Sequence, residues 1–168
     1  MKYLALLRHA KSSWKNADLD DFDRPLNERG KRDAPMMGRR LQARGVRPSL
    51  IVSSPAKRAR QTAQLVAQAI NYPVEFLQRE AELYLADPGT ILAAIAAQED
   101  SFGSIVVCGH NPGMTDLANR LTNSRIDNVP TCGIVGMEAD IQHWKEIMDA
   151  EWRLVYFDYP KRIPEKSS

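Results

Sequence analysis

The sequence predicts an α/β protein with three layers, α/β/α, in which helices cover both faces of a mostly parallel sheet. Two observations support this prediction. Apolar runs of about five residues, too short for helices and too continuous for half-exposed strands, alternate with longer segments of helical periodicity. Polar residues follow several of these runs directly, and in such folds the ligand crevice lies outside the carboxyl ends of the strands.

Length and composition are those of an ordinary globular protein. The chain has 168 residues, so we expect a single domain over residues 1–168 that ends in a polar tail from about residue 160. Its net charge of +2 is too small to indicate a nucleic-acid partner, and no apolar run is long enough for a signal peptide or a membrane span. We therefore expect no nucleic acid and no membrane among its partners, and we expect a monomer.

The two cysteines indicate a reducing environment. Cys108 lies in an apolar run and Cys132 lies in a turn-like stretch, so the pair forms neither a disulfide framework nor a paired metal motif. A cytoplasmic location is therefore expected.

The first strand is expected at residues 3–7, where an apolar run ends directly in Arg8 and His9. At the end of a buried strand these two side chains either bind a ligand or merely cap the strand in solvent. Residues 11–23 are rich in Lys, Ser, Asn and Asp and predict a long loop. A loop of this length beside a strand end often has a functional role.

A helix and a strand–helix pair follow this loop. Asn27 is expected to cap a helix that stops at Gly45, and Pro35 inside it predicts a kink or a late start. A second strand is expected at residues 48–52, and a helix at residues 56–70.

Arg58 is expected in the first turn of that second helix. A cation at this place opposes the helix macrodipole and costs free energy unless an anion lies nearby. The alternative is a solvated basic face that Arg58 shares with Lys57 and Arg60.

The second half of the chain continues the alternation of strands and helices. We expect a short strand at residues 73–77, a helix capped by Asp87, a strand at residues 104–108 and a helix after residue 113. Two further strands are expected at residues 134–137 and 153–157. A short helical stretch at residues 141–148 is expected between them.

Three strand-to-helix turns carry polar residues that a parallel sheet would bring to one edge. They hold Arg8 and His9, then Arg58, then His110 and Asn111, and they include two of the three histidines of the chain. Two arginines and the backbone amides of helix N-termini can bind a tetrahedral dianion, so the sequence predicts a phosphate pocket. A neutral imidazole in such a pocket can attack phosphorus, and a second histidine can stabilise the charge on the phosphoryl oxygens.

These residues resemble the motifs of a known family. Arg8-His9-Ala10, residues 54–63 and residues 109–113 resemble the three signature motifs of the histidine phosphatase superfamily, which has the phosphoglycerate mutase-like fold. Residues 8–14, 23–26 and 157–161 resemble more narrowly the SixA-type phosphohistidine phosphatases, and the resemblance spans nearly the whole chain. Many relatives have glycine at the third signature position, where this chain has Ala10.

The resemblance implies a covalent, metal-independent mechanism without a cofactor. His9 is expected to be the nucleophile that becomes phosphorylated, and Arg8, Arg58 and His110 are expected to complete the phosphate pocket. Many members of the family also use an acid between the second and third motifs, and Glu82 matches that position best.

Several further residues are weaker candidates. Glu82 could protonate a leaving group if burial raised its pKa, or it could be a solvated glutamate. Arg24 could reach the substrate from the long loop, and Asn111 is expected to help bind it. Lys11 and His143 are expected to be surface residues.

Other enzyme classes lack the required motifs. A cysteine phosphatase needs Cys-x₅-Arg, but Met114 and Glu138 stand where the arginines would be. There is no P-loop sequence, and arginines beside His9 and His110 would repel a metal ion.

Three functions remain open on this fold. The first is hydrolysis of phosphohistidine on a phosphorylated protein or peptide. Residues 71–103 leave no room for a large helical insertion over the pocket, so an open site that admits a protein side chain is expected. The second is a small-molecule phosphomonoesterase or mutase, and the third is a non-catalytic module that binds phosphoproteins. An intact nucleophile argues against the third function, because binding needs the arginines but not His9.

Overall fold

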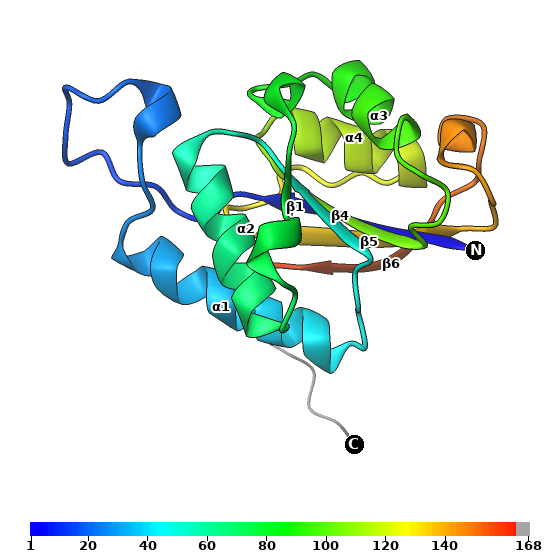
Figure 1. Cartoon of the computed structure of the whole chain (residues 1–168), viewed down its shortest axis with the longest axis horizontal. Coiled ribbons are helices and arrows are strands. Elements are labelled where there is room, and N and C mark those ends of the chain that lie inside the picture. The colour runs from blue at the N-terminus through cyan, green and yellow to red at the C-terminus, as the bar shows by residue number, and fades with distance from the viewer. Residues whose placement is uncertain (164–168) are drawn as a thin grey trace.

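A computed structural model describes residues 1–163, and the polar tail expected from about residue 160 lies largely outside them. The described residues form a six-stranded sheet in the order β3-β2-β4-β1-β5-β6 (Figure 1). The strands are β1 (Lys2–Arg8), β2 (Leu50–Ser53), β3 (Gln78–Arg79), β4 (Ser104–Gly109), β5 (Ile134–Ala139) and β6 (Arg153–Asp158).

The sheet is mostly parallel, as predicted. β1 pairs in parallel with β4, β4 with β2, and β2 with β3, whereas β5 is antiparallel to both β1 and β6. The carboxyl ends of β1, β2 and β4 therefore meet at the same edge of the sheet.

Helices cover both faces of the sheet and give the predicted three layers (Figure 1). α1 and α2 lie against one face and α3 and α4 against the other. The helices are α1 (Glu28–Ala43), α2 (Lys57–Ala69), α3 (Pro88–Ala96) and α4 (Gly113–Thr122), with short 3₁₀ helices η1 (Asp21–Asp23), η2 (Val74–Phe76), η3 (Ala81–Leu83) and η4 (Trp144–Glu146).

β1 shows why its sequence is continuously apolar. Leu4 and Leu6 belong to the hydrophobic cluster under α3 and α4, and Ala5 and Leu7 belong to the cluster under α1 and α2. Side chains of a strand alternate between the faces of a sheet, so a strand covered on both faces needs apolar residues at every position. This central strand ends at the edge where the polar turns gather.

α1 begins where its cap predicts and is not delayed by its proline. The Asn27 side chain accepts a hydrogen bond from the Gly30 amide, and the helix continues through Pro35 to Ala43. Gly45 then adopts a φ of +80°, the left-handed conformation that ends many helices at glycine. The expectation of a late start at Pro35 is wrong, because the cap and the buried apolar face of the helix outweigh the missing amide donor.

Two of the predicted elements differ from the structure. The strand predicted at residues 73–77 is wrong: Val74–Phe76 is a 3₁₀ helix, and pairing with β2 involves only Gln78 and Arg79. Val74 and Phe76 are 41% and 65% exposed, so the alternation there does not mark a buried face. The helical stretch predicted at residues 141–148 is reduced to the single 3₁₀ turn Trp144–Glu146.

Among residues 1–163, no helix combines the length and the apolar character that crossing a membrane would require.

Candidate active site

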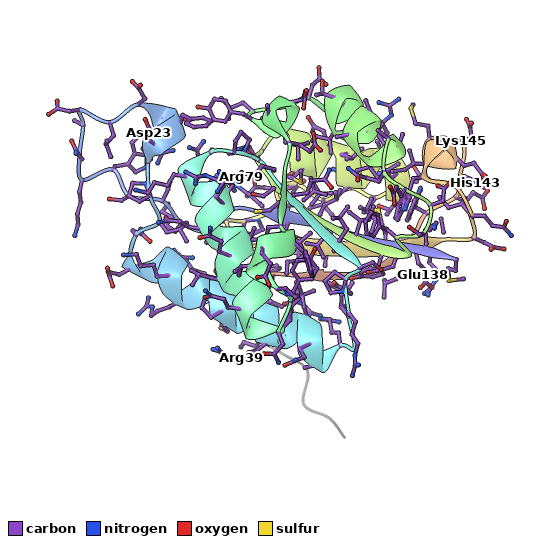
Figure 2. The ribbon with its side chains drawn as sticks, in the orientation of Figure 1. Asp23, Arg39, Arg79, Glu138, His143 and Lys145 are labelled. Atoms are coloured by element: carbon purple, nitrogen blue, oxygen red, sulfur yellow. The ribbon has the colours of Figure 1, made fainter. Side chains whose placement is uncertain are left out.

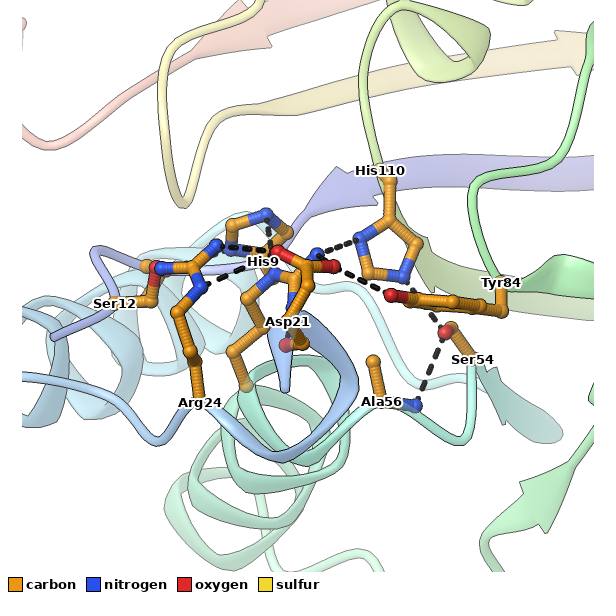
Figure 3. A network of polar contacts seen from close by, with 10 residues as sticks. His9, Ser12, Asp21, Arg24, Ser54, Ala56, Tyr84 and His110 are labelled. Atoms are coloured by element: carbon orange, nitrogen blue, oxygen red, sulfur yellow. Dashed lines mark hydrogen bonds and ion pairs between the residues drawn. The ribbon is translucent and has the colours of Figure 1, made fainter. Parts of the chain in front are cut away.

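Three turns at the carboxyl edge of the sheet bring His9, His110 and Arg58 together, and Figure 3 shows the two histidines. His9 follows β1, His110 follows β4, and Arg58 lies in the first turn of α2. The ring centroids of His9 and His110 are 5.2 Å apart. Arg58 lies between them, with Nε 3.3 Å from His9 Nε2 and Nη2 3.4 Å from His110 Nδ1. The structure thus places three of the residues expected in the phosphate pocket within direct contact.

The orientation of His9 leaves one ring nitrogen available as a nucleophile. Nδ1 lies 2.8 Å from the Ala10 carbonyl oxygen, which can only accept, so Nδ1 holds the ring proton and Nε2 keeps its lone pair. The Ala10 amide donates to Thr62 Oγ1, and this hydroxyl donates to the Arg58 carbonyl oxygen, at 2.9 and 2.7 Å. Thr62 therefore links the loop that carries His9 to the helix turn that carries Arg58.

The end of β1 is fixed on both sides by backbone hydrogen bonds. The His9 amide donates to the Gly109 carbonyl oxygen at 3.0 Å. The Cys132 amide donates to the carbonyl oxygens of Arg8 and His9, at 3.1 and 3.0 Å, from a residue with a φ of +62°. Cys132 and Cys108 are buried free cysteines, and burial raises the pKa of both thiols, so neither is suited to be a nucleophile.

Burial keeps both histidines of the site neutral. Desolvation, together with the nearby Arg58 guanidinium, lowers the pKa of His9 to about 3 and that of His110 to about 4. His110 Nε2 lies 2.7 Å from Ser54 Oγ, and Nδ1 faces the Arg58 donor, so the ring proton of His110 belongs on Nε2. Two neutral rings in this pocket leave the lone pair of His9 free at physiological pH.

The low pKa values predict an unusual titration. We expect the NMR ring-proton shifts of His9 and His110 to keep their neutral values from about pH 8 down to about pH 5, where an ordinary imidazole would be mostly protonated. Over the same range the unfolded chain binds more protons than the folded chain, so the free energy of unfolding should fall as the pH falls below about 6.5. The His143→Gln variant removes the third histidine signal for assignment. A midpoint near pH 6.5 for either active-site ring would contradict the burial argument.

Arg58 is not part of a solvated face, since it is only 3% exposed. Its Nη1 donates to the Asp21 carbonyl oxygen at 2.6 Å, and its Nη2 donates to Asp21 Oδ2 at 2.9 Å. The Asp21 carboxylate is thus an anion close to the N-terminal turn of α2. It offsets the unfavourable placement of a cation at this end of the helix.

Arg8 contributes a guanidinium that is only partly paired. Its Nη1 donates to the Val129 carbonyl oxygen at 3.0 Å. Its Nε is buried and has no hydrogen-bond partner among the described residues. A buried donor without a partner is costly, so an acceptor from a bound ligand would stabilise this atom.

Asn111 and Arg8 both donate to the Val129 carbonyl oxygen. Asn111 Nδ2 donates to Asn128 Oδ1 and to the Val129 carbonyl oxygen, both at 3.0 Å, and its Oδ1 accepts from the amide and hydroxyl of Thr115. These contacts hold the loop around Val129 against α4, and Arg8 donates to the same carbonyl oxygen. The side chain expected to bind substrate is therefore engaged within the protein.

Arg24 reaches the site from the long loop and contacts Asp21. Its Nε and Nη2 lie 3.2 and 3.0 Å from Asp21 Oδ1, and its Nη1 donates to Ser12 Oγ. The guanidinium also stacks on the exposed Trp14 ring, 3.6 Å from the centroid. Arg24 and Arg58 thus bind the same carboxylate from two directions.

Tyr84 completes this network and was not expected from the sequence. Its hydroxyl donates to Asp21 Oδ2, and its ring lies edge-on to His110 with centroids 5.5 Å apart. A Cβ atom on Gly113 would lie 2.2 Å from the Ala86 carbonyl oxygen, so glycine there lets the loop that carries Tyr84 approach α4. The sequence pointed to the segment that contains Tyr84 only through Glu82, the candidate acid two residues earlier.

The remaining candidates lie outside the network of Figure 3. Glu82 is exposed on η3, two residues before Tyr84, and makes no side-chain hydrogen bond to the described residues. Lys11 is exposed. His143 binds Asp100 at the opposite end of the molecule from Asp23 (Figure 2).

No group of three or more His, Cys, Asp or Glu side chains in the described part of the chain is arranged to hold a metal ion.

Comparisons with known proteins identify the family and the fold of this chain. The family model of the histidine phosphatase superfamily (branch 1) matches residues 4–99, which include His9 and Arg58. An uncharacterized protein of Mycobacterium tuberculosis is 33% identical over 165 residues, which cover 92% of this chain and 100% of that protein.

Two solved structures share the architecture. The SixA protein of Agrobacterium tumefaciens, a candidate phosphohistidine phosphatase, has a TM-score of 0.81 and 33% identity over 95% of this chain and 98% of that chain. A protein histidine phosphatase SixA solved with tungstate has a TM-score of 0.79 over 94% of this chain and 97% of its own, and at 22% identity it shows the fold alone. The fold is phosphoglycerate mutase-like, and the match to the family model extends over more than half of the chain. This chain belongs to the histidine phosphatase superfamily.

Proposed function

We propose that the protein hydrolyses phosphohistidine on proteins through a covalent phosphohistidine intermediate at His9. The observation that carries this proposal is the state of the His9 ring. Nδ1 is held by the Ala10 carbonyl oxygen, and the unprotonated Nε2 faces Arg58. A buried, neutral and oriented imidazole beside guanidinium groups is suited to attack a phosphoryl group.

The first step needs no external proton. His9 Nε2 forms a bond to phosphorus, the P–N bond of the substrate breaks, and its electron pair stays on the departing nitrogen. If the substrate ring carries a proton on its other nitrogen, it leaves as a neutral imidazole. His9 then becomes a phosphoimidazolium whose Nδ1–H still donates to the Ala10 carbonyl oxygen.

The second step releases phosphate. Water attacks the phosphorus, the P–N bond to His9 breaks, and Nε2 recovers its lone pair while the proton of the water passes to phosphate and solvent. Arg58, the unpartnered Nε of Arg8, and His110 can stabilise the phosphoryl oxygens in both steps.

Among the described residues no protonated acid lies beside His9, and this favours a phosphohistidine substrate over a phosphate ester. An alkoxide leaving group must gain a proton as the P–O bond breaks, and the family-based candidate for this role, Glu82, is exposed. An imidazole leaving group that is already protonated on its other nitrogen avoids this requirement. Glu82 as the acid stays a prediction for the alternative function, a small-molecule phosphomonoesterase or mutase.

The short connection between α2 and β4 favours a protein substrate. Between α2 and β4 the chain forms only η2, β3, η3 and α3, and α3 lies on a face of the sheet (Figure 1). A hollow of about 600 Å³ lined by Tyr3, Arg44 and Ser104 lies at the opposite edge of the sheet, away from the histidines. A site without a helical cover can admit a side chain that projects from a protein surface.

This proposal predicts a substrate preference. Purified protein should hydrolyse a phosphohistidine-bearing protein with a kcat/KM at least about tenfold above that for phosphoglycerate or a sugar phosphate, because only the phosphohistidine supplies its own leaving-group proton. The His9→Ala variant, assayed in parallel, gives the spontaneous hydrolysis of the phosphohistidine. If the small phosphate esters were preferred by about tenfold, the small-molecule alternative would replace the proposal.

The setting of this activity is part of the proposal. Both cysteines of the chain are free thiols, which supports a reducing compartment such as the cytoplasm. We propose a monomer that acts on phosphoproteins without nucleic acid, membrane, metal or cofactor.

A further inference from the structure

Two arginines of the site, Arg58 and Arg24, already bind a carboxylate. Asp21 Oδ1 accepts from Nε and Nη2 of Arg24, at 3.2 and 3.0 Å, and Asp21 Oδ2 accepts from Nη2 of Arg58 at 2.9 Å and from the Tyr84 hydroxyl. Figure 3 shows this carboxylate among Arg24, His9 and Tyr84. An anion of the protein itself therefore lies beside the place where the phosphoryl group would bind.

Asp21 is charged and faces the solvent side of the site. Although desolvation opposes ionisation, hydrogen bonds from Tyr84, Arg24 and Arg58 hold the pKa of Asp21 well below its ordinary value. Its side chain is 43% exposed, whereas that of Arg58 is only 3% exposed. A carboxylate in this state cannot donate a proton at neutral pH, but it adds a fixed negative charge on the side from which a substrate enters.

We propose that Asp21 is a specificity-determining residue that disfavours dianionic phosphate esters and favours phosphoryl groups attached to a protonated imidazole. This inference rests on the proposed function. A phosphate-ester dianion close to the Asp21 carboxylate is repelled and must compete with it for Arg58 and Arg24. A phosphohistidine with a protonated ring carries a compensating positive charge, and its ring N–H can donate to a carboxylate.

Neutralising this charge is the direct test. The Asp21→Asn variant keeps the size of the side chain and removes the charge. We expect the ratio of kcat/KM for a phosphohistidine peptide to kcat/KM for p-nitrophenyl phosphate to fall at least about tenfold, and competitive inhibition by inorganic phosphate to tighten at least about fivefold. Asp21→Glu, which restores the charge, should recover most of the ratio.

Asp23 provides a matched control on the same 3₁₀ turn. It is exposed, and Figure 2 shows it on the short helix η1 that also carries Asp21. Asp23→Asn removes the same charge from the same turn and should change neither the ratio nor phosphate inhibition by more than about twofold. If it changed both as much as Asp21→Asn, a general charge effect would replace the specific role of Asp21.

A purely structural role of Asp21 has a different signature. If the carboxylate only positioned Arg58 and Arg24, Asp21→Asn would lower kcat/KM for both substrates equally and weaken phosphate binding, and that result would overturn the inference. Asp21→Ser, a second neutral variant, serves if the asparagine variant does not fold. The phosphate measurement needs no phosphohistidine, so it tests the charge effect even if the wild-type protein prefers phosphate esters and the proposed function fails.

Discussion

The His9→Ala variant is expected to lose turnover, with kcat/KM for a phosphohistidine protein reduced by on the order of 10⁴-fold or more, as for loss of a covalent nucleophile. His9 Nε2 is the unprotonated ring nitrogen that faces Arg58, and alanine leaves no group there that can accept the phosphoryl group. Rapid quench with labelled substrate should trap a phosphoenzyme in the wild-type protein that is labile in acid and stable in base. His9→Ala should give none.

His143 provides the control for this experiment. It is the third histidine and pairs with Asp100 far from the site, so His143→Ala should keep both turnover and the phosphoenzyme. A phosphoenzyme that persists in His9→Ala would overturn the assignment of the nucleophile. Binding of a phosphoprotein by the wild type without any phosphoenzyme or turnover would support the non-catalytic module instead.

The Arg58→Ala variant is expected to lose at least about 2.7 kcal/mol of transition-state stabilisation, which is roughly a hundredfold in kcat/KM. Arg58 is buried, donates towards His9 and His110, and also holds Asp21. Its removal takes away a preorganised charge that cannot be replaced by water, because the two imidazoles around it are themselves buried.

Arg60 is the matched control for Arg58. It lies on the same helix two residues later and donates from Nε to the Pro55 carbonyl oxygen, away from the histidines. Arg60→Ala should change kcat/KM by less than about threefold. Steady-state kinetics on both variants, with thermal unfolding to confirm folding, make the comparison. A loss below about tenfold for Arg58→Ala would show that Arg8 and His110 suffice to bind the phosphoryl group.

The sequence predicted correctly the strands that are buried on both faces of the sheet and the helix whose cap and stop signals agree. β1 and β4 have continuous apolar runs because both faces of the sheet are covered, and α1 has a cap at Asn27 and a glycine stop at Gly45. It was a poor guide at residues 73–77, where alternation suggested a strand. The residues that pair with β2 are Gln78 and Arg79, just after that region, and pairing depends on contacts that a local pattern does not contain.

The long loop shows the same limit at the site. Four aspartates lie between residues 18 and 23, and nothing local distinguishes Asp21 from the other three. The loop is anchored by distant contacts: the Ser13 amide donates to the Pro25 carbonyl oxygen, and the Leu26 amide donates to Gln61 Oε1. These contacts bring Asp21 to Arg58, and no periodicity records them.

By itself, the sequence determined that the protein has a mostly parallel α/β sheet and that Arg8, His9, Arg58 and His110 follow or adjoin its strand ends. Those residues could be predicted because the carboxyl ends of parallel strands meet at one edge of the sheet, independently of the conformation of the loops. Only the tertiary structure decided that Nε2 is the free nitrogen of His9, and that Asp21 and Tyr84 join the site while Glu82 stays exposed. Side-chain hydrogen bonds between distant segments set these features, and they exist only once the chain has folded.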